Sequence, residues 1–549
     1  MKASDLFVKC LEAEGVKRIY GVPGEENADF MKSLENSSIE FILTRHEQGA
    51  AFMASVYGRL TGEVGVCLGT LGPGATNLMT GVADGNMDHA PLLVITGQGA
   101  LTRQHKESHQ VMNVVDMYRP ITKWSCAVNH PDNIPEIVHK AVRIAVTEKP
   151  GACHIELAED VAAMQTNVPA MRAATPRRPV PDEHAIDAAW ERLKSAKSPI
   201  IIAGNGAIRT RASQELRALC EATGIGALMT FMAKGALDLT DPRCLFTIGM
   251  GHRDYPQLAI DAADLVITIG YDPVEYGPSK WNAECKADII HMDFDPAESD
   301  QHYQPRVEVI GDLAHGLAAL NARITQDGVP DYDFSAQRKL RETMQDEFAA
   351  HAEDTTEGKI RPQKAIADVR AVLGPDDILL SGVGSHKMWV ARHYQSNNPN
   401  TCLISNGFCS MGMPLPGAIA AKHARPDARV LAVVGDGDIM MNIQEMETAS
   451  RLDADITMLV WEDKGYGLIA WKQDQDFGSH TDLSFNNPDW EQLCKSMNWH
   501  HQACDKAAEL RDCLKTALDH ESPALVVIPI DYRENMALTE KLGEIDATF

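Results

Sequence analysis

The sequence predicts an α/β protein made of three doubly wound parallel-sheet domains. Short apolar runs alternate with helical patterns along most of the 549 residues, which is the rhythm of parallel strands joined by crossover helices. Runs such as residues 430–434 are continuously apolar, as expected for a strand that is buried on both faces. The length suits about three domains, each with its own core.

The first domain is expected over residues 1–165 and begins with a helical pattern at residues 3–15. Its second predicted strand runs into the polar segment 44–50, and its third runs into the glycine-rich loop 69–77. Ligands of open α/β sheets bind at the carboxyl ends of the strands, so these two segments are candidates for a site. The strands of this domain are predicted at residues 18–20, 40–43, 64–68 and 91–96.

A proline-rich linker, residues 166–184, separates the first domain from a middle domain expected over residues 185–325. The turn Gly204-Asn205-Gly206 follows its first strand and could bind a dinucleotide, but the full GxGxxG pattern is missing. A charged connection with a helical pattern, residues 327–361, leads to the third domain, expected over residues 360–549. Middle-domain strands are predicted at residues 199–203, 265–269 and 288–293, and third-domain strands at 378–381, 403–404, 430–434, 456–461 and 524–529.

The overall charge and composition exclude several classes of partner. The net charge of −26 argues against nucleic acid and anionic membranes. The twelve cysteines show no paired CxxC spacing, so neither a zinc site nor a disulfide framework is indicated. The chain contains no apolar run long enough to span a membrane. Its N-terminal residues enter an amphipathic helix directly and do not have the pattern of a signal peptide, so we expect a cytoplasmic protein.

Two acidic glycine turns lie at the centre of the third domain. The strand at 430–434 runs into Gly-Asp-Gly-Asp, a helical pattern follows from residue 439 to about 451, and the strand at 456–461 runs into Glu-Asp-Lys-Gly-Tyr-Gly. Asp436 and Asp463 are therefore expected to converge at one sheet edge. Two such carboxylates, completed by phosphate and water oxygens, suit Mg²⁺. An isolated turn of this kind can also reflect only a need for glycine at positive φ.

With these two turns the chain resembles the thiamine diphosphate (ThDP) enzymes, whose signature is Gly-Asp-Gly followed at this spacing by Asn. Asp463 departs from that Asn, and the FAD-independent acetolactate synthases are similar in carrying Asp there. The first-domain segments RHEQGAAFMA, GPGATNL, KESHQ and ITKW are also similar to acetolactate synthases. The resemblance covers nearly the entire chain. It implies a pyrimidine-binding first domain, a Rossmann-like middle domain and a diphosphate-binding third domain.

The resemblance implies roles at the reactive end of the cofactor. Glu47 matches the carboxyl group that contacts the aminopyrimidine and favours its imino tautomer, although a glutamate at a helix start can also simply be solvated. Met411 matches the apolar wedge that bends the cofactor, although it could instead be one of many core methionines. The carbonyl of Cys409 and the amide of Met411 match the groups that bond the aminopyrimidine edge.

For the diphosphate and its ion, the resemblance implies two loops and three metal ligands. Gly437 and Asp438 open a helix whose amides can face phosphate. The charge of Asp438 is a departure from the family and is unfavourable near phosphate unless the side chain turns away. The second loop is Gly384, Ser385 and His386; the expected Mg²⁺ ligands are Asp436, Asp463 and the carbonyl of Gly465.

In the first domain, Pro23, Thr70 and Asn77 match positions that meet the cofactor. Gln110 matches a glutamine that reaches the reacting carbon, although it could also be an ordinary polar loop residue. In this family the first domain of one subunit completes the site on the third domain of another. The resemblance therefore implies a homo-oligomer with active sites at the dimer interface, and we expect a dimer of dimers.

The expected reaction is carboligation, in which pyruvate loses CO₂ and the resulting carbanion adds to a second pyruvate to give 2-acetolactate. Simple decarboxylases share a His-His pair where this chain has His109 and Gln110, and glyoxylate carboligase has an apolar residue in place of Glu47. FAD is not expected, because Tyr271-Asp272-Pro273 stands where FAD-binding relatives have Arg-Phe-Asp-Asp. The alternatives are a carboligase, lyase or decarboxylase for another 2-oxo acid or an aldehyde, and a non-catalytic assembly subunit.

Overall fold

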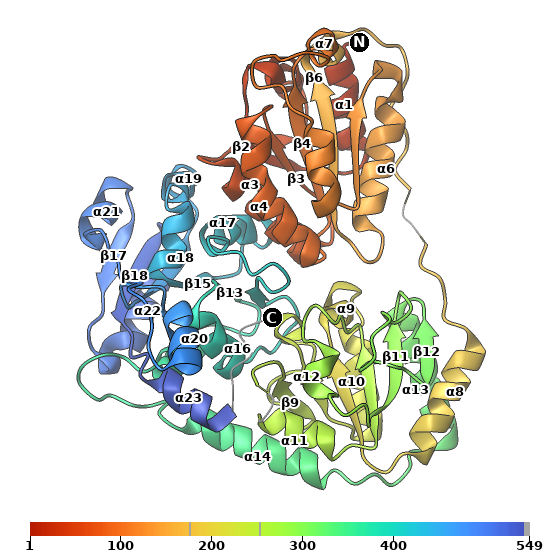
Figure 1. The fold of residues 1–549 in the computed structure, drawn as a ribbon, viewed down its shortest axis with the longest axis vertical. Coiled ribbons are helices and arrows are strands. Elements are labelled where there is room, and N and C mark those ends of the chain that lie inside the picture. The colour runs from red at the N-terminus through yellow and green to blue at the C-terminus, as the bar shows by residue number, and fades with distance from the viewer. Residues whose placement is uncertain (175–176, 252–253, 543–549) are drawn as a thin grey trace.

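The computed structural model describes residues 1–174, 177–251 and 254–542, and within them it contains three sheets of six parallel strands (Figure 1). The predicted fold class is confirmed. The three sheets lie within residues 18–158, 199–310 and 378–529. Residues 175 and 176 of the proline-rich linker and the last residues, 543–549, lie outside the described chain.

The first and third sheets have the same topology, with β2-β1-β3-β4-β6-β5 matching β14-β13-β15-β16-β18-β17. The first sheet contains β1 Arg18–Val22, β2 Glu40–Leu43, β3 Gly65–Gly69, β4 Leu92–Gln98, β5 Trp124–Val128 and β6 Ala152–Ala158. The third contains β13 Ile378–Ser381, β14 Cys402–Ile404, β15 Val430–Gly435, β16 Ile456–Glu462, β17 His500–Ala503 and β18 Ala524–Pro529. The sequence did not predict β5, β6 and β17. The other strands of both sheets lie within two residues of their predicted bounds.

The middle sheet has the strand order β12-β11-β10-β7-β8-β9. The chain first builds outward from β7 to β9 and then adds β10 to β12 on the other side of β7, as in dinucleotide-binding folds. Its strands are β7 Pro199–Ala203, β8 Ala227–Met229, β9 Cys244–Thr247, β10 Leu265–Ile269, β11 Asp288–Asp293 and β12 Val307–Ile310. The three predicted strands, β7, β10 and β11, have the expected bounds. The others have only three or four residues and were not predicted.

Helices cover both faces of the sheets (Figure 1). In the first domain the main ones are α1 Ala3–Ala13, α2 Ala28–Leu34, α3 Glu47–Thr61, α4 Pro73–Met87 and α6 Ile134–Val146. In the middle domain they are α8 Glu183–Ser195, α9 Asn205–Arg209, α10 Ser213–Thr223, α11 Tyr255–Asp261 and α13 Leu313–Asp327. In and before the third domain they are α14 Ser335–Ala349, α15 Pro362–Val372, α16 Ser385–His393, α17 Pro414–Ala424, α19 Glu445–Arg451, α20 Gly467–Phe477, α21 Trp490–Ser496, α22 Leu510–Leu518 and α23 Glu534–Leu542.

The helix expected from residue 439 to about 451 is interrupted, so that prediction was wrong in detail. The chain forms α18 Asp436–Ile439, a 3₁₀ turn over Met440–Asn442, and then α19. The side-chain amide of Asn442 donates a hydrogen bond of 2.9 Å to the carbonyl of Gly412. This bond ties the turn to a distant loop, which the local helical pattern does not reveal.

The first and third domains share one hydrophobic core, in which α3 lies between α4 and α17. Small residues allow the helices to approach closely. A Cβ atom added to Gly81 of α4 would lie 2.6 Å from the Cβ of Ala51 on α3. A Cβ added to Gly417 of α17 would lie 3.0 Å from a methyl group of Val56, also on α3. Close packing of this kind fixes the two domains relative to each other.

A buried carboxylate reinforces this contact. Glu445, at the start of α19, accepts hydrogen bonds from the backbone amides of Arg45 (3.1 Å) and His46 (3.0 Å) and from the hydroxyl of Thr448 (2.6 Å). The side chain is fully buried, and burial raises its pKa. A third-domain side chain therefore satisfies backbone amides just before α3, which would otherwise be unpaired.

The middle domain is joined to both others. Asp272, after β10, pairs with Lys149 (2.9 Å) and His89 (2.8 Å) of the first domain. Arg392 of α16 pairs with Glu347 of α14 (2.8 Å), and α14 runs along the base of the molecule between the middle and third domains (Figure 1). No helix in the described part of the chain is long and apolar enough to cross a membrane.

The packing of α3 against α4 gives a first prediction. Gly81→Ala places a methyl group against rigid atoms of α3, so we expect it to destabilise the fold by about 1–3 kcal/mol and to lower the midpoint of thermal unfolding, measured by scanning calorimetry. Gly277→Ala is the matched control, because its new methyl group meets nothing closer than 3.9 Å and its φ is −58°. Equal midpoints for the two variants would contradict the packing described here.

Candidate active site

The third-domain half of the site begins at the ends of β15 and β16. These strands are neighbours in register, with Gly435 opposite Trp461, so Asp436 and Asp463 follow at the same edge of the sheet. Both carboxylates line a cavity of about 110 Å³. All predicted third-domain residues except Cys409 line it: Gly384, Ser385, His386, Met411, Asp436, Gly437, Asp438, Asp463 and Gly465.

Asp436 is fully buried and heavily hydrogen-bonded. It accepts bonds from the amide of Lys464 (2.7 Å) and the side chain of Asn487 (2.8 Å), and its other oxygen accepts from the amide of Gly437 (2.9 Å). Burial and the charge of Asp436 raise the pKa of Asp463 to about 7. Two carboxylates that repel each other in a buried setting fit a divalent cation, which would remove the repulsion.

The donor set also fits a hard cation that is shared with a ligand. No group of three or more His, Cys, Asp and Glu side chains in the described chain is placed to hold a metal. An ion at Asp436 and Asp463 would therefore need further oxygens from backbone and phosphate. That coordination is typical of Mg²⁺, which keeps few protein ligands and binds through substrate phosphates.

The loop before α16 forms the opposite wall of this cavity. Gly384 has a φ of 153°, a conformation that favours glycine, and it precedes the first turn of the helix. His386 is buried, and its Nε2 atom lies 3.5 Å from an oxygen of Asp438; neither atom has a hydrogen-bond partner among the described residues. The unpaired ring nitrogen of His386, in the first turn of α16, suits an anionic group with many oxygens, whereas the unpaired oxygen of Asp438 calls for a donor.

One oxygen of Asp438 faces His386, and this contact together with a hydrogen bond explains how its charge is tolerated. Its other oxygen accepts a hydrogen bond of 2.6 Å from the amide of Gly412. Gly412 directly follows Met411, so Asp438 holds the loop that carries the predicted wedge. The sequence analysis treated this residue as an unfavourable departure, whereas the structure assigns it a contact of its own.

Cys409 lies just outside the cavity, on the same loop as Met411. Its φ is 55°, and its thiol lies 2.8 Å from the carbonyl of Asn406 and 2.9 Å from the Lys387 ammonium group. The unusual backbone turns the chain between Cys409 and Met411. Relatives with glycine at this position would adopt the same turn without strain.

Two aspartates hold this loop, Asp84 of α4 and Asp88 directly after that helix, and the sequence analysis missed both. Asp88 accepts hydrogen bonds from the amides of Gly407 (2.7 Å) and Asn406 (3.3 Å). Asp84 accepts from the hydroxyl of Ser405 and from the amide of Ser410 (3.3 Å). Burial and the charge of Asp88 raise the pKa of Asp84 to about 7. Their spacing of four on a helix places both on one face, which is the signal that could have indicated a shared target.

Glu47 organises the first-domain half of the site. It is the first residue of α3, 8% exposed, and its carboxylate accepts a hydrogen bond of 2.9 Å from the side-chain amide of Asn77. Glu47 is thus a fixed carboxylate at the edge of its domain, and the structure brings Asn77 to it.

Pro23, Glu47 and Thr70 follow β1, β2 and β3, respectively, at one edge of the first sheet. A Cβ added to Gly24, beside Pro23, would lie 2.3 Å from the hydroxyl of Thr70, so these two loops touch. Gln110 is exposed, with a φ of 57°, and packs beside Gly72 in the loop that carries Thr70. The structure therefore gathers the first-domain candidates at one sheet edge.

Three sequence models of known families match consecutive parts of the chain. They describe the N-terminal TPP binding domain (residues 1–117), the central domain (186–320) and the C-terminal TPP binding domain (382–528) of thiamine pyrophosphate enzymes. The chain belongs to the thiamine pyrophosphate enzymes. It is therefore an α/β enzyme that uses thiamine diphosphate, another name for the same cofactor.

Full-length relatives narrow the class. The chain is 33% identical to "Acetolactate synthase" of Bacillus subtilis (strain 168), over 100% of this chain and 97% of the relative. It is 33% identical to "Acetolactate synthase, catabolic" of Raoultella terrigena, over 98% of this chain and 97% of the relative. It is 32% identical to "Probable acetolactate synthase large subunit" of Methanocaldococcus jannaschii, over 99% of this chain and 94% of the relative. This thiamine pyrophosphate enzyme is thus close to the acetolactate synthases and is a carboligase-type transferase.

The two halves of the site do not share a cavity within one chain of this thiamine pyrophosphate enzyme. The cavity at Asp436 and Asp463 is lined by third-domain residues, and none of the first-domain candidates is among them in the described chain. Instead, the start of α3 faces Glu445 of its own third domain. Each half is therefore open to completion by another molecule.

The aspartate pair gives a second prediction for this thiamine pyrophosphate enzyme. Asp436→Ala removes a carboxylate at the core of the cavity, and we expect ThDP binding in the presence of Mg²⁺ to weaken about 100-fold or more, measured by titration calorimetry. Asp463→Asn keeps an oxygen at the same place and should weaken it far less. The exposed Asp505→Ala is the control and should bind as the unmodified protein does. Equal losses from Asp436→Ala and Asp463→Asn would contradict the ligand roles.

Proposed function

We propose that this enzyme joins two molecules of pyruvate to 2-acetolactate with release of CO₂, using ThDP and Mg²⁺ in sites between two subunits. The observation that carries the proposal is the combination of two findings. The chain is similar to acetolactate synthases over its whole length, and it has the carboxylates predicted for both halves of the site. Glu47 stands at the edge of the first domain, and Asp436 and Asp463 stand at the edge of the third.

The chemistry that ThDP supplies when bound is a nucleophilic carbon, which takes up a 2-oxo acid and allows its CO₂ to leave. Glu47 would hold a proton at the far nitrogen of the aminopyrimidine ring, which favours the tautomer that activates this carbon. The hydrogen bond from Asn77 fixes one carboxylate oxygen of Glu47 and leaves the other free to act. Gln110 would contact the reacting centre from the exposed loop beside Gly72.

Other residues would hold the rest of the cofactor. Met411 would support the bent rings, and the Cys409 carbonyl and Met411 amide would bond the aminopyrimidine edge. The amides at the starts of α16 and α18 would bind the diphosphate. Asp436, Asp463 and the carbonyl of Gly465 would hold Mg²⁺, which would supply positive charge for that diphosphate. From the partner subunit, Pro23 would pack against the pyrimidine and Thr70 would also meet the cofactor.

Exposed apolar side chains near the third-domain cavity support a subunit interface. Tyr466 and Ile469 line the cavity and are 40% and 50% exposed. Phe408, beside Cys409, is 45% exposed, as is Met441 after α18. A group of large exposed apolar residues is typical of a surface that another chain covers. We infer a homodimer at least, with a dimer of dimers as the expected assembly.

The proposal includes no flavin. A side chain on Gly204 would meet the carbonyl of Gly270 at 2.4 Å, so the glycine turn after β7 is packed against the end of β10. The amide of Asn205 donates to the carboxylate of Glu275 (2.9 Å), whose pKa burial raises to about 8. That amide is therefore engaged inside the protein. Asp272, in the stretch on which the sequence-based expectation rested, is paired with Lys149, so its charge is offset and Glu275 is the stronger obstacle.

The third prediction tests the reaction and the role of Glu47 together. Purified protein with ThDP, Mg²⁺ and pyruvate, without added flavin, should form 2-acetolactate, detected by chemical shift in NMR. Glu47→Gln should slow exchange of the thiazolium proton about 100-fold or more, as expected for loss of an acid–base group. ThDP binding should change little, because Gln fills the same space.

Three results would contradict the proposal. Acetaldehyde as the sole product would make the enzyme a decarboxylase. Product from another 2-oxo acid or an aldehyde, with none from pyruvate alone, would make it a carboligase of different specificity. An unchanged exchange rate in Glu47→Gln would remove that residue from cofactor activation. Glu63→Gln, at an exposed ion pair of the same domain, is the matched control and should leave exchange unchanged.

A further inference from the structure

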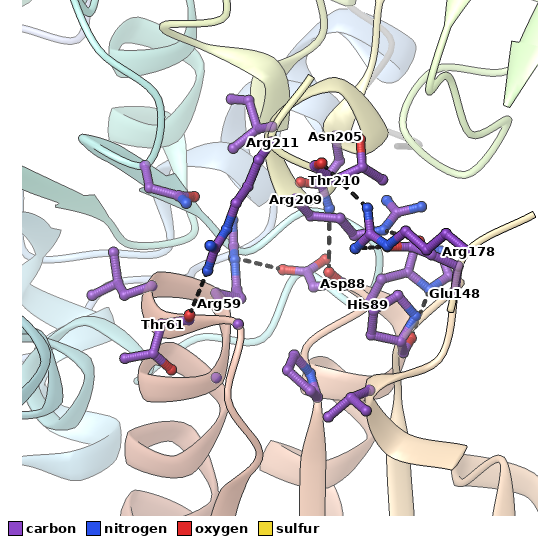
Figure 2. A pocket seen from close by; sticks show the side chains of 18 residues that line it. Arg59, Thr61, Asp88, His89, Glu148, Arg178, Asn205, Arg209, Thr210 and Arg211 are labelled. Atoms are coloured by element: carbon purple, nitrogen blue, oxygen red, sulfur yellow. Dashed lines mark hydrogen bonds and ion pairs between the residues drawn. The ribbon is translucent and has the colours of Figure 1, made fainter. Parts of the chain in front are cut away.

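A second cavity, of about 320 Å³, lies between the first domain, the proline-rich linker and the middle domain (Figure 2). Its volume falls within the range of small-molecule sites. It is separate from the cavity at Asp436 and Asp463, with which it shares no lining residue. The end of α3, the residues after α4 and the helix α9 contribute to its walls.

Arg209, the last residue of α9, has an incomplete set of hydrogen bonds in this cavity. Its side chain is only 10% exposed. Its Nε atom donates to Glu148 (2.9 Å), but both terminal nitrogens of the guanidinium group are buried and have no hydrogen-bond partner in the described chain. Leaving charged donors unpaired is costly, so two unused N–H-bearing nitrogens indicate a missing acceptor.

The charges around Arg209 favour an anion as that acceptor. Four arginines line the cavity, Arg59, Arg178, Arg209 and Arg211, against two carboxylates, Asp88 and Glu148. Both carboxylates are already paired, Asp88 with Arg59 (3.1 Å) and Glu148 with Arg209. Arg178 pairs with Asp312 (3.2 Å), so within the described chain Arg211 is the one arginine of the four without a carboxylate partner, in a chain whose net charge is −26.

The other arginines converge on the cavity from different elements (Figure 2). Arg211 donates only to the carbonyl of Thr61 (3.3 Å), and Arg178 donates to the carbonyl of Thr210 (3.3 Å) and to Asp312 (3.2 Å). Both side chains are exposed, so they stand where the cavity meets solvent. Such a ligand could enter past them and reach the buried Arg209.

We propose that this cavity is a binding site for the phosphate group of a small anionic ligand, held by Arg209 and Arg211. The two free nitrogens of Arg209 and the guanidinium of Arg211 offer more donors than the two oxygens of a carboxylate accept, whereas a phosphate monoester has three free oxygens and a charge of about −1.5 to −2 at neutral pH. The guanidinium fork of Arg209 suits two oxygens of one phosphate. The volume leaves room for more than inorganic phosphate, which favours a phosphate ester or diphosphate.

The site also has a physical connection to the cofactor loop. Asp88, which forms part of the cavity wall with Arg59, accepts hydrogen bonds from the amides of Asn406 and Gly407. Those residues lead directly to Cys409 and Met411. Arg59 and Asp88 therefore link this wall of the cavity to the loop that carries Met411.

The fourth prediction uses the holoenzyme, saturated with ThDP and Mg²⁺ so that its diphosphate site is filled. Titration calorimetry with inorganic phosphate, pyrophosphate and ADP, at fixed free Mg²⁺ and ionic strength, should show saturable binding of one molecule per chain. Arg209→Gln and Arg211→Gln should each weaken it about tenfold or more. Arg306→Gln, which changes an arginine 73% exposed directly before β12, is the matched control and should bind normally. Tighter binding of ADP than of phosphate would identify an ester as the ligand class, and equal binding would identify free phosphate.

Two outcomes would overturn the proposal. No saturable binding of any phosphate probe at millimolar concentration would mean that water alone fills the cavity. Binding of acetate, lost in the same variants and at least as tight as that of the phosphates, would make this a carboxylate site. Arg211 is exposed, so its variant keeps the test valid if Arg209→Gln does not fold. Because the readout is binding, the result is independent of which reaction the enzyme catalyses.

Discussion

The packing of α3 between α4 and α17 is the contact on which the rest of this structure depends. It merges the cores of the first and third domains, and Glu445 completes it by capping the backbone amides just before Glu47. The same contact places α4 against the loop at residues 405–411, where Asp84 and Asp88 hold the backbone that leads to Met411. Exchanging any of these small or acidic residues would therefore disturb both halves of the site at once.

The shared topology of the first and third sheets explains why each contributes half a site. In each sheet, polar loops follow the central parallel strands at their carboxyl ends. One edge presents a single buried carboxylate, Glu47, with Asn77 beside it. The other presents the repelling pair Asp436 and Asp463, beside two helix starts with unpaired polar atoms. The half-site in the first domain suits a ring nitrogen, and the half-site in the third domain suits a cation and a diphosphate. We propose that the two half-sites meet between two chains.

The role of a residue could be predicted from the sequence where a local sequence pattern defines that role. It could not be predicted where the role depends on how one domain packs against another. Asp436 and Asp463 follow apolar strands in an obvious pattern, and the rule for parallel sheets places them together. Asp84, Asp88 and Glu445 lie on or directly after helices where acidic residues are ordinary, and only the approach of another domain brings them the backbone amides that they bind. The break between α18 and α19 was missed for the same reason, because Asn442 bonds to a distant loop. Arg209 stands out only once its unpaired nitrogens are seen in a cavity.

The central claim is that the two half-sites of one chain serve different active sites, and mixed oligomers test it most directly. Glu47→Gln and Asp436→Ala should each be nearly inactive alone. The two variants are co-expressed in equal amounts, and the mixed dimers are purified through two different tags. Each mixed dimer should have one intact site of two, and therefore about half of the normal activity. Because about half of the dimers form as mixed dimers, the mixture before this purification should regain about a quarter of the normal activity. If the mixed dimers stay as inactive as either parent, Glu47 and Asp436 act within the same chain and this account is wrong.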